Sequence, residues 1–270
     1  MSKKIHMVCC GMGINSISMT MELIKKKVKL DIILFANTGG EKPHTYNFIP
    51  YFNQWLKKNR TNEVTVIQAS QPQQISDGCL ENECLRLWNM PSKAYGFGTC
   101  SLKWKIMPQQ VWVERYLLKH KIDNPSIIKY IGYDADEANR ASRSAPYEGI
   151  YSKEYPLIDW GWGREECIKK IRQNGLPSPG KSSCFFCPST KKKEILKMIQ
   201  QYPNLVVRSL EIERRGMSLK KGPSPQTTVG LGRSFMWRDF ILDAAKKDFK
   251  VSCDEENDMM PCDNCYDGEV

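Results

Sequence analysis

The chain has 270 residues, enough for one large domain or for a core domain with a small appendage. With 41% hydrophobic and 26% charged residues, its composition is that of an ordinary globular protein. Since no apolar run approaches about 18 residues, we expect no membrane span. The apolar run after the basic residues 1–6 is short, which argues against a signal peptide and predicts a cytoplasmic protein.

Charge is distributed unevenly along the chain, whose formal net charge is +10. Residues 251–270 contain seven acidic and no basic side chains, so the preceding 250 residues hold all 40 basic and 23 acidic ones, a balance of +17. A body this basic favours anionic partners such as nucleotides or nucleic acid. A solvated basic surface is an equally good interpretation.

The N-terminal part alternates between apolar runs and segments with helical spacing. Residues 5–10, 31–36 and 64–69 are short apolar runs, which predict buried strands. Residues 16–27 and 43–58 have helical spacing. The order strand–helix–strand–helix–strand indicates an α/β fold, an open parallel sheet with helices on both faces.

The later segments are predicted more coarsely. Residues 70–100 are expected to be mostly loop, and residues 104–119 a helix with Pro108 near its start. The elements expected beyond them are strands at 127–132 and 155–158 and helices at 163–174, 190–202, 204–214 and 234–247. The chain is thus predicted to divide into an α/β domain (1–175), a helical, cysteine-bearing region (176–250) and an acidic tail (251–270).

The first predicted turn has the composition of a phosphate-binding loop. Its sequence, GMGINS at residues 11–16, lies between the first strand and the first helix. Glycine lets the backbone approach a phosphate, the helix N-terminus offers free N–H groups, and Ser16 adds a hydroxyl. A plain tight turn is the competing interpretation.

Two further strand ends are polar and contain glycine. Asn37, Thr38 and Gly39 follow the second strand, and Gly132 ends the strand at 127–132. Ligands of open α/β sheets bind outside the carboxyl ends of the strands. We therefore expect these segments and the first turn to converge on one crevice.

Together these segments resemble the phosphoadenylyl-sulfate (PAPS) reductase family within the PP-loop ATP pyrophosphatases, an adenine nucleotide alpha-hydrolase-like superfamily. The family's SGGxDS loop corresponds to residues 11–16, and its DTGxxFPETY element to residues 37–46. Its GxRxxE/QSxxR element resembles residues 132–140, and the segments YPLIDW and CFFCP also fit. The similarity spans about residues 5–200.

The chain departs from the family pattern at several positions. Gly11 replaces the first Ser of the loop, Asn15 replaces its Asp, and Tyr133 stands where the family has Arg. The family's C-terminal cysteine motif, ECGLH, is absent from the sequence. The resemblance therefore supports the nucleotide-binding fold more firmly than the reductase activity.

The resemblance implies a PP-loop domain that binds ATP or a sulfonucleotide with Mg²⁺. It implies catalytic roles for Ser16 and for Arg140, which would pair with a phosphate oxygen. The residues implied to bind the nucleotide are Gly11, Met12, Gly13, Asn15, Ser16, Asn37, Thr38, Gly39 and Gly132.

The chain has 11 cysteines, which without a secretion signal favour metal or redox chemistry over a disulfide framework. Cys184 and Cys187 form a CxxC motif, a spacing that points two thiolates at one metal. Cys100 lies in a stretch that resembles the cluster-binding segment of iron–sulfur adenylyl-sulfate reductases. The tail offers Cys262 or Cys265 as a fourth ligand, with Cys253 nearby, and Cys265 is the predicted one.

Two cluster designs are consistent with these cysteines. Either four thiolates hold a [4Fe-4S] cluster, or three hold it and leave one iron open, as in some ATP-dependent tRNA thiolases; zinc is the alternative occupant. Cys9, Cys10 and Cys167 are expected to be small buried apolar residues. Cys79 and Cys84 fit either role.

The expected reaction is attack on the α-phosphate of ATP, which adenylylates an acceptor and releases pyrophosphate before sulfur displaces AMP. The basic body favours tRNA or DNA as acceptor, by analogy with tRNA thiolation and DNA phosphorothioation. A sulfur donor or a thioredoxin-like protein is a further expected partner. The alternatives are a sulfonucleotide reductase that produces sulfite and a non-catalytic nucleotide-sensing accessory protein.

Overall fold

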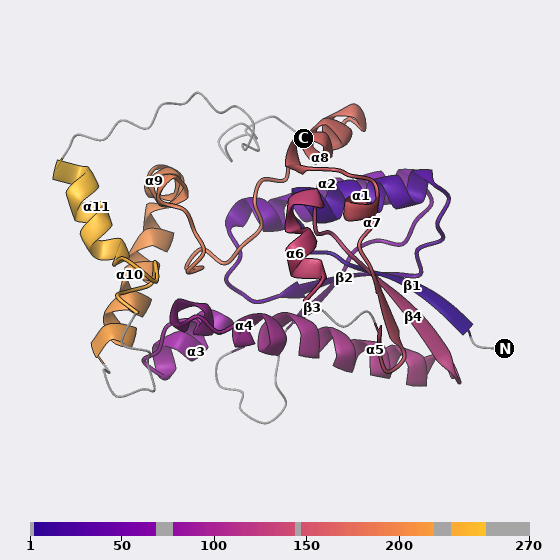
Figure 1. The fold of residues 1–270 in the computed structure, drawn as a ribbon, viewed down its shortest axis with the longest axis horizontal. Helices are drawn as coiled ribbons and strands as arrows, with labels where there is room; N and C mark the ends of the chain where they lie inside the picture. Colours follow the sequence, from indigo (N-terminus) through magenta and orange to yellow (C-terminus); the bar gives the residue numbers. More distant parts are fainter. Residues whose placement is uncertain (1–2, 69–77, 144–146, 219–227, 247–270) are drawn as a thin grey trace, which may run out of the picture.

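A computed structural model describes residues 3–68, 78–143, 147–218 and 228–246 (Figure 1). Within these ranges no helix combines the length and apolar character needed to cross a membrane. The predicted metal ligand Cys265 and the whole acidic tail lie outside the described residues.

The centre of the fold is a six-stranded sheet in the order β3-β2-β1-β4-β6-β5. Five strands run parallel, and the short edge strand β5 pairs antiparallel with β6. The strands are β1 (Lys3–Cys9), β2 (Ile32–Asn37), β3 (Thr65–Gln68), β4 (Pro125–Ile131), β5 (Tyr147–Glu148) and β6 (Tyr151–Glu154). The predicted α/β fold with an open parallel sheet is confirmed.

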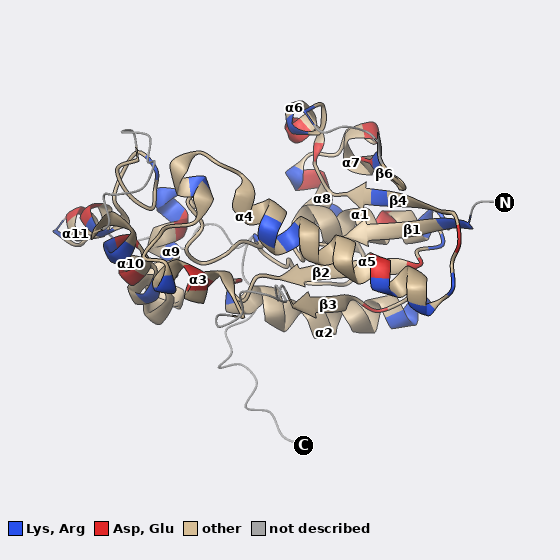
Figure 2. Ribbon diagram, turned by 90° about the horizontal axis from the view of Figure 1, so that it is seen from below, with Lys and Arg blue, Asp and Glu red and all other residues tan. Residues whose placement is uncertain are grey.

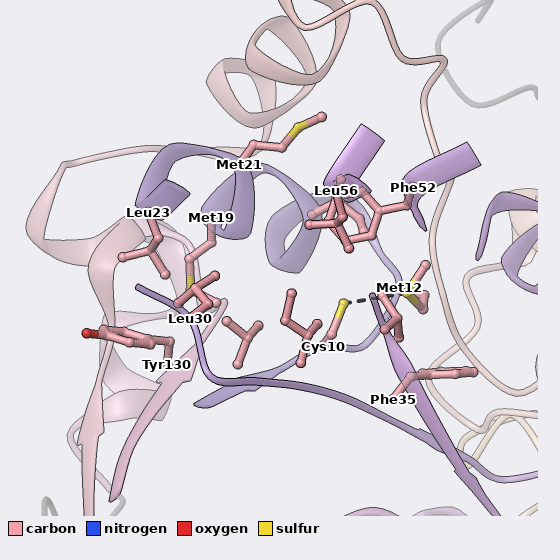
Figure 3. Close-up of a cluster of buried hydrophobic side chains, with 14 of the residues drawn as sticks. Cys10, Met12, Met19, Met21, Leu23, Leu30, Phe35, Phe52, Leu56 and Tyr130 are labelled. Carbon is pink, nitrogen blue, oxygen red and sulfur yellow. Dashed lines mark hydrogen bonds between the residues drawn. The ribbon is translucent and has the colours of Figure 1, made fainter. Parts of the chain in front are cut away.

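Helices cover both faces of this sheet (Figure 1). α1 (Ile14–Lys25), α2 (Pro43–Lys58) and α8 (Arg164–Gln173) bury their apolar residues against one face. α5 (Met107–Lys119) covers the other. Figure 3 shows the first of these two cores, in which Met19 of α1 and Phe52 of α2 approach the strands. Burial on both faces explains why the strands are nearly continuous apolar runs.

Besides the two cores on the faces of the sheet, a further cluster of buried side chains joins the C-terminal helices to the segment around α3 (Leu80–Arg86). These helices are α9 (Lys192–Gln201), α10 (Pro203–Ser218) and α11 (Trp237–Lys246). The buried carboxylate of Glu213 on α10 accepts hydrogen bonds from the N–H groups of Leu231 (2.7 Å) and Trp237 (2.9 Å). Glu213 thus caps α11 and ties it to α10.

The predictions for residues 70–100 and 155–158 need correction. The first segment contains α3 and a short 3₁₀ helix, Ser92–Tyr95, where mostly loop was expected. The strand predicted at 155–158 is wrong. Strand β6 ends at Glu154, and Pro156 begins a short helix, α7 (Pro156–Asp159), because its fixed φ suits the first helical position.

The helix predicted at 104–119 begins earlier than expected. A helical segment runs from α4 (Thr99–Ser101) through a π-helical turn, Leu102–Ile106, into α5. Pro108 therefore lies inside a helical run. Proline lacks an N–H and crowds the carbonyl one turn earlier, and the wider π turn directly before it relieves both problems.

Candidate functional site

The predicted crevice lies where the strand order reverses. β1 pairs with β2 on one side and with β4 on the other. After β1 the chain continues to β2, toward one edge of the sheet, and after β4 it continues to β5 and β6, toward the other edge. This is the position at which open α/β sheets bind ligands. Gly11 follows β1, and Gly132 follows β4.

The glycine turn at residues 11–16 is tightly enclosed. A Cβ on Gly13 would lie 2.8 Å from Oγ of Ser182, so a larger residue there would require the Ser182 hydroxyl to move. Met12 has a φ of 58°, a left-handed conformation that costs an L-residue about 1–2 kcal/mol. Its side chain is fully buried and accepts a contact from the Cys10 thiol at 3.5 Å (Figure 3). Met12 as a whole is 0% exposed, so no part of this residue lies open to a ligand in this conformation.

Ser16 is buried and bonded within the turn. Its hydroxyl donates to the carbonyl of Gly13 at 3.1 Å. Ile17 N–H donates to the same carbonyl, and this is the first backbone hydrogen bond of α1. The N–H groups of the residues before Ile17 therefore have no partner within the helix. A Cβ on Gly132 would lie 2.9 Å from the backbone nitrogen of Ser16. The end of β4 thus packs directly on the first turn of α1.

Asn15 and Arg140, the other predicted side-chain contacts of this crevice, differ in exposure. Asn15 Nδ2 donates to Oδ2 of Asp134 at 2.9 Å, which links the first turn to the segment after β4. Arg140 lies on an exposed short helix, α6 (Ala138–Ala141), and pairs with Glu137 at 2.8 Å. Its guanidinium stacks on Tyr133, 4.2 Å from the ring centroid. Contact between Arg140 and a phosphate stays a prediction.

The second predicted turn is held by its own side chains. Asn37 Oδ1 accepts from Gly39 N–H (2.8 Å) and from the Tyr46 hydroxyl (2.8 Å). Gly39 has a φ of 73°, and a Cβ there would lie 2.3 Å from Cβ of Cys79. Glycine is therefore required both for the turn and for the approach of Cys79.

The CxxC segment is built onto this second turn. Cys184 forms an isolated antiparallel bridge with Glu41, and its sulfur lies 3.2 Å from Thr38 Oγ1. Ser182, two residues earlier, contacts Gly13 of the first turn. The cysteine motif and both predicted nucleotide-binding turns consequently form one continuous structure.

An ion pair with a buried carboxylate and a partly exposed lysine accompanies Cys184. Glu41 has a fully buried side chain and pairs with Lys105 of the π turn at 3.1 Å. Burial, together with the negative charge of Glu41, raises the pKa of the Cys184 thiol to about 12, although Lys105 and the bond to Thr38 oppose this shift. Burial lowers the pKa of Lys105, but Glu41 and Cys184 raise it overall. As it stands, the thiol is protonated at neutral pH.

Further cysteines gather around Cys184. Burial raises the pKa of Cys84, and the charges of Glu83, Cys184, Cys100 and Cys79 add to the shift. Cys84 belongs to the buried cluster around α3, the predicted ligands Cys100 and Cys184 pack against that cluster, and Cys79 lies beside Gly39 of the second turn. Cys187 also acts electrostatically on Cys184.

The remaining described cysteines occupy packing positions. Cys10 and Cys167 are almost completely buried in the core that contains α1 and α8. Cys9 is partly buried and packs against the core beneath α5. Burial raises the pKa of Cys9 and of Cys10 to about 11. The predicted packing role of these three cysteines fits these surroundings.

Among the described residues, no three His, Cys, Asp or Glu side chains are placed to share one metal ion. A single zinc ion therefore has no preformed three-ligand site in this part of the chain. The donor set around Cys184 is nevertheless thiol-rich, the chemistry that suits zinc and iron–sulfur clusters. The fit of the site around Cys184 to an iron–sulfur cluster therefore rests on the chemistry of its thiols.

Sequence reasoning missed several residues of this site. Glu41 and Lys105 form the ion pair, Ser182 covers the glycine turn, and Asp134 binds Asn15. One signal was present, because the charged pair Glu41–Lys42 follows two glycines between an apolar strand and a helix. Nothing in the local sequence placed Lys105 or Ser182 beside residues about 64 and 169 positions earlier.

Comparison with known proteins assigns no family. No family model matches the sequence, and no curated protein matches it. One solved structure with some similarity is the U34-tRNA thiolase NcsA from Methanococcus maripaludis with its [4Fe-4S] cluster. It shares 13% sequence identity with this chain at a TM-score of 0.43, over 82% of this chain and 74% of the other. Likeness at this level assigns neither residues nor a reaction.

Proposed function

We propose that this protein is a PP-loop enzyme that cleaves ATP to AMP and pyrophosphate and transfers sulfur to a nucleic acid. The observation that carries the proposal is the attachment of the CxxC segment to both glycine-containing turns, through Ser182 on Gly13 and through Cys184 on Thr38. A thiol site built onto a phosphate site fits a reaction that activates an acceptor and then delivers sulfur. The resemblance of residues 5–200 to PP-loop enzymes supports the same reaction.

In the first step an acceptor oxygen attacks the α-phosphorus of ATP, and the bond to pyrophosphate breaks. The free N–H groups and the dipole at the start of α1 stabilise negative charge on the phosphates. The Ser16 hydroxyl fixes the turn by its bond to Gly13. Arg140 reaches a phosphate oxygen once its exposed pair with Glu137 opens.

In the second step a sulfide equivalent attacks the atom that bears the adenylylated oxygen. The bond from that atom to oxygen breaks, and AMP leaves with the oxygen. Cys100, Cys184 and Cys187 are the proposed ligands of a [4Fe-4S] cluster beside the crevice, with Cys265 as fourth ligand or one iron left open, and zinc as the alternative. If Cys100, Cys184 and Cys187 alone held the cluster, its open iron would supply a position for the sulfur to be transferred.

The acceptor is proposed to be tRNA or DNA, because residues 1–250 have a charge balance of +17. The reaction is proposed to take place in the cytoplasm. Figure 2 shows Lys and Arg on the helices that flank the sheet as well as on the C-terminal helices. A long polyanion contacts such a distributed set of charges better than a small ligand does.

The test is a product assay on the full chain purified without oxygen. ATP, sulfide and bulk tRNA should yield pyrophosphate, AMP and a thiolated nucleoside detected by mass spectrometry. Cys184→Ser should keep nucleotide binding and lose sulfur incorporation, and Gly98→Ala, where a Cβ meets open space, is the matched control.

Other products would identify the alternatives. Sulfite released from PAPS with a thioredoxin-like donor would establish the reductase. Nucleotide binding without any product from ATP or PAPS would establish the accessory protein.

A further inference from the structure

Two oxygen atoms beside the glycine turn are buried without a partner. Asp134 is 8% exposed, and its Oδ2 accepts the bond from Asn15 Nδ2. Within the described part of the chain, Asp134 Oδ1 and Asn15 Oδ1 accept no hydrogen bond. Asp134 also enters no ion pair with a described residue.

These two oxygen atoms need a cation or a hydrogen-bond donor beside them. Buried acceptors are almost always hydrogen-bonded, and a buried carboxylate is costly unless a positive charge compensates it. The bond from Asn15 satisfies one carboxylate oxygen and turns the amide so that its own oxygen is left over. The remaining acceptors are two hard oxygen atoms on side chains that already touch.

Their position relates them to the phosphates. Asn15 is the second residue of α1, and Asp134 lies two residues beyond Gly132, whose backbone packs on Ser16. The oxygens thus lie at the junction of β1 and β4, at the same helix end that offers N–H groups to an anion. Asn15 carries no charge, so the negative charge of this pair comes from Asp134.

Magnesium suits this arrangement. Mg²⁺ prefers oxygen ligands and is usually held by one or two carboxylates together with substrate phosphates and water, and not by an all-protein cage. Asp134 supplies the carboxylate of such a site, and Oδ1 of Asn15 supplies a second oxygen ligand.

We propose that Asp134 and Asn15 form a divalent-cation site, in which Oδ1 of each side chain binds Mg²⁺ and the nucleotide phosphates complete the coordination. The contribution of the phosphates rests on the proposed function, whereas the two protein ligands do not. The cation neutralises the buried carboxylate and joins the end of β4 to the nucleotide.

The experiment uses Mn²⁺, a paramagnetic substitute for Mg²⁺, with the full chain. Electron paramagnetic resonance should show one bound Mn²⁺ in the wild-type protein and tighter binding when a non-hydrolysable ATP analogue is present. Asp134→Asn should weaken Mn²⁺ binding by well over tenfold, and Asn15→Ala by about tenfold. Asp136→Asn, which removes an exposed carboxylate two residues along, should bind Mn²⁺ as the wild type does.

A second variant guards against a folding defect. Asn15→Asp places two carboxylates side by side, so it should lower the melting temperature in EDTA and tighten Mn²⁺ binding. Equal Mn²⁺ affinity in wild type, Asp134→Asn and Asn15→Asp would overturn the inference and leave a buried water as the occupant. Mn²⁺ binding that depends on Asp134 in a protein without pyrophosphate release would keep the cation site and reject the proposed function.

Discussion

Gly132 illustrates how much a single residue decides in this site. Its backbone lies so close to α1 that a Cβ would meet the Cα and nitrogen of Ser16, both at 2.9 Å. Backbone atoms on a helix cannot move aside as a side chain does. The contact therefore fixes the distance between the two strand ends that frame the crevice.

We expect Gly132→Ala to lower the free energy of unfolding by about 1–3 kcal/mol, the usual range for overpacking. Urea denaturation measures the change. Gly98→Ala is the control, because a Cβ there has nothing within 4 Å and its φ is negative, so stability should stay within about 0.5 kcal/mol of wild type. Equal stability of the two variants would show that the strand ends are not held this closely.

The thiol of Cys184 gives a prediction about pH. Its raised pKa means that the folded state holds the proton more tightly than the unfolded state does, so this contribution to stability is present below pH 9 and is lost as the pH rises toward 12. Glu41→Gln should lower the pKa of Cys184 and speed its alkylation in the metal-free protein at fixed alkaline pH. Lys105→Met should raise the pKa and slow the reaction.

Peptide mapping after iodoacetamide treatment resolves the individual cysteines. Cys10 serves as the internal reference, because burial raises its pKa to about 11 against the opposing bonds to Met12 and Ser16, and Glu41 has no part in that shift. A Glu41→Gln protein that alkylates Cys184 no faster, relative to Cys10, would contradict the assigned electrostatics.

At the scale of elements, α10 and α11 depend on one buried carboxylate. Glu213 accepts three backbone N–H groups, from Leu231, Trp237 and Arg238. Glu213→Ala leaves the first two of these donors buried without an acceptor, and hydrogen bonds to a charged group are worth about 1.5–3 kcal/mol each. We expect a loss of stability of at least about 3 kcal/mol, with early loss of α11 in hydrogen exchange.

Glu211, two residues before Glu213 on the same helix, supplies the control. It is more exposed and bonds Arg214 and Arg215 at the surface. Glu211→Ala should change stability far less, since surface ion pairs contribute little. A Glu211 variant as unstable as the Glu213 variant would contradict the capping role assigned to Glu213.

The elements also show where sequence reasoning succeeded and where it could not. The helix predicted at 43–58 has the bounds of α2, because proline starts it and a strong apolar face sustains it. α3 was missed because it is short and because its buried side, Leu80 and Cys84, packs against C-terminal helices far along the chain. The glycine turns were visible as motifs, whereas the Glu41–Lys105 pair depends on a π turn that carries no recognisable sequence signal.

At the scale of the whole molecule, the charge balance makes a prediction about nucleic acid. If residues 1–250 bind tRNA or DNA through phosphate contacts, affinity should fall steeply with salt, because bound counterions are released. Deleting residues 251–270 removes seven negative charges and should strengthen binding at every salt concentration. Filter binding across a salt series measures both effects, and a flat salt dependence would favour a small-molecule acceptor.

The strand order has a consequence for synthesis on the ribosome. β1 is central in the finished sheet, yet its partner β4 is made more than a hundred residues later, with Met7 opposite Lys129. Until then the sheet of the nascent chain consists of β1, β2 and β3, and the edge of β1 that later pairs with β4 is open to pairing with other strands. Non-local pairing of this kind folds slowly and invites misassembly. The junction of β1 and β4, where the nucleotide is proposed to bind, is thus among the last features to form, and nascent chains halted before residue 125 should depend on chaperones to remain in solution.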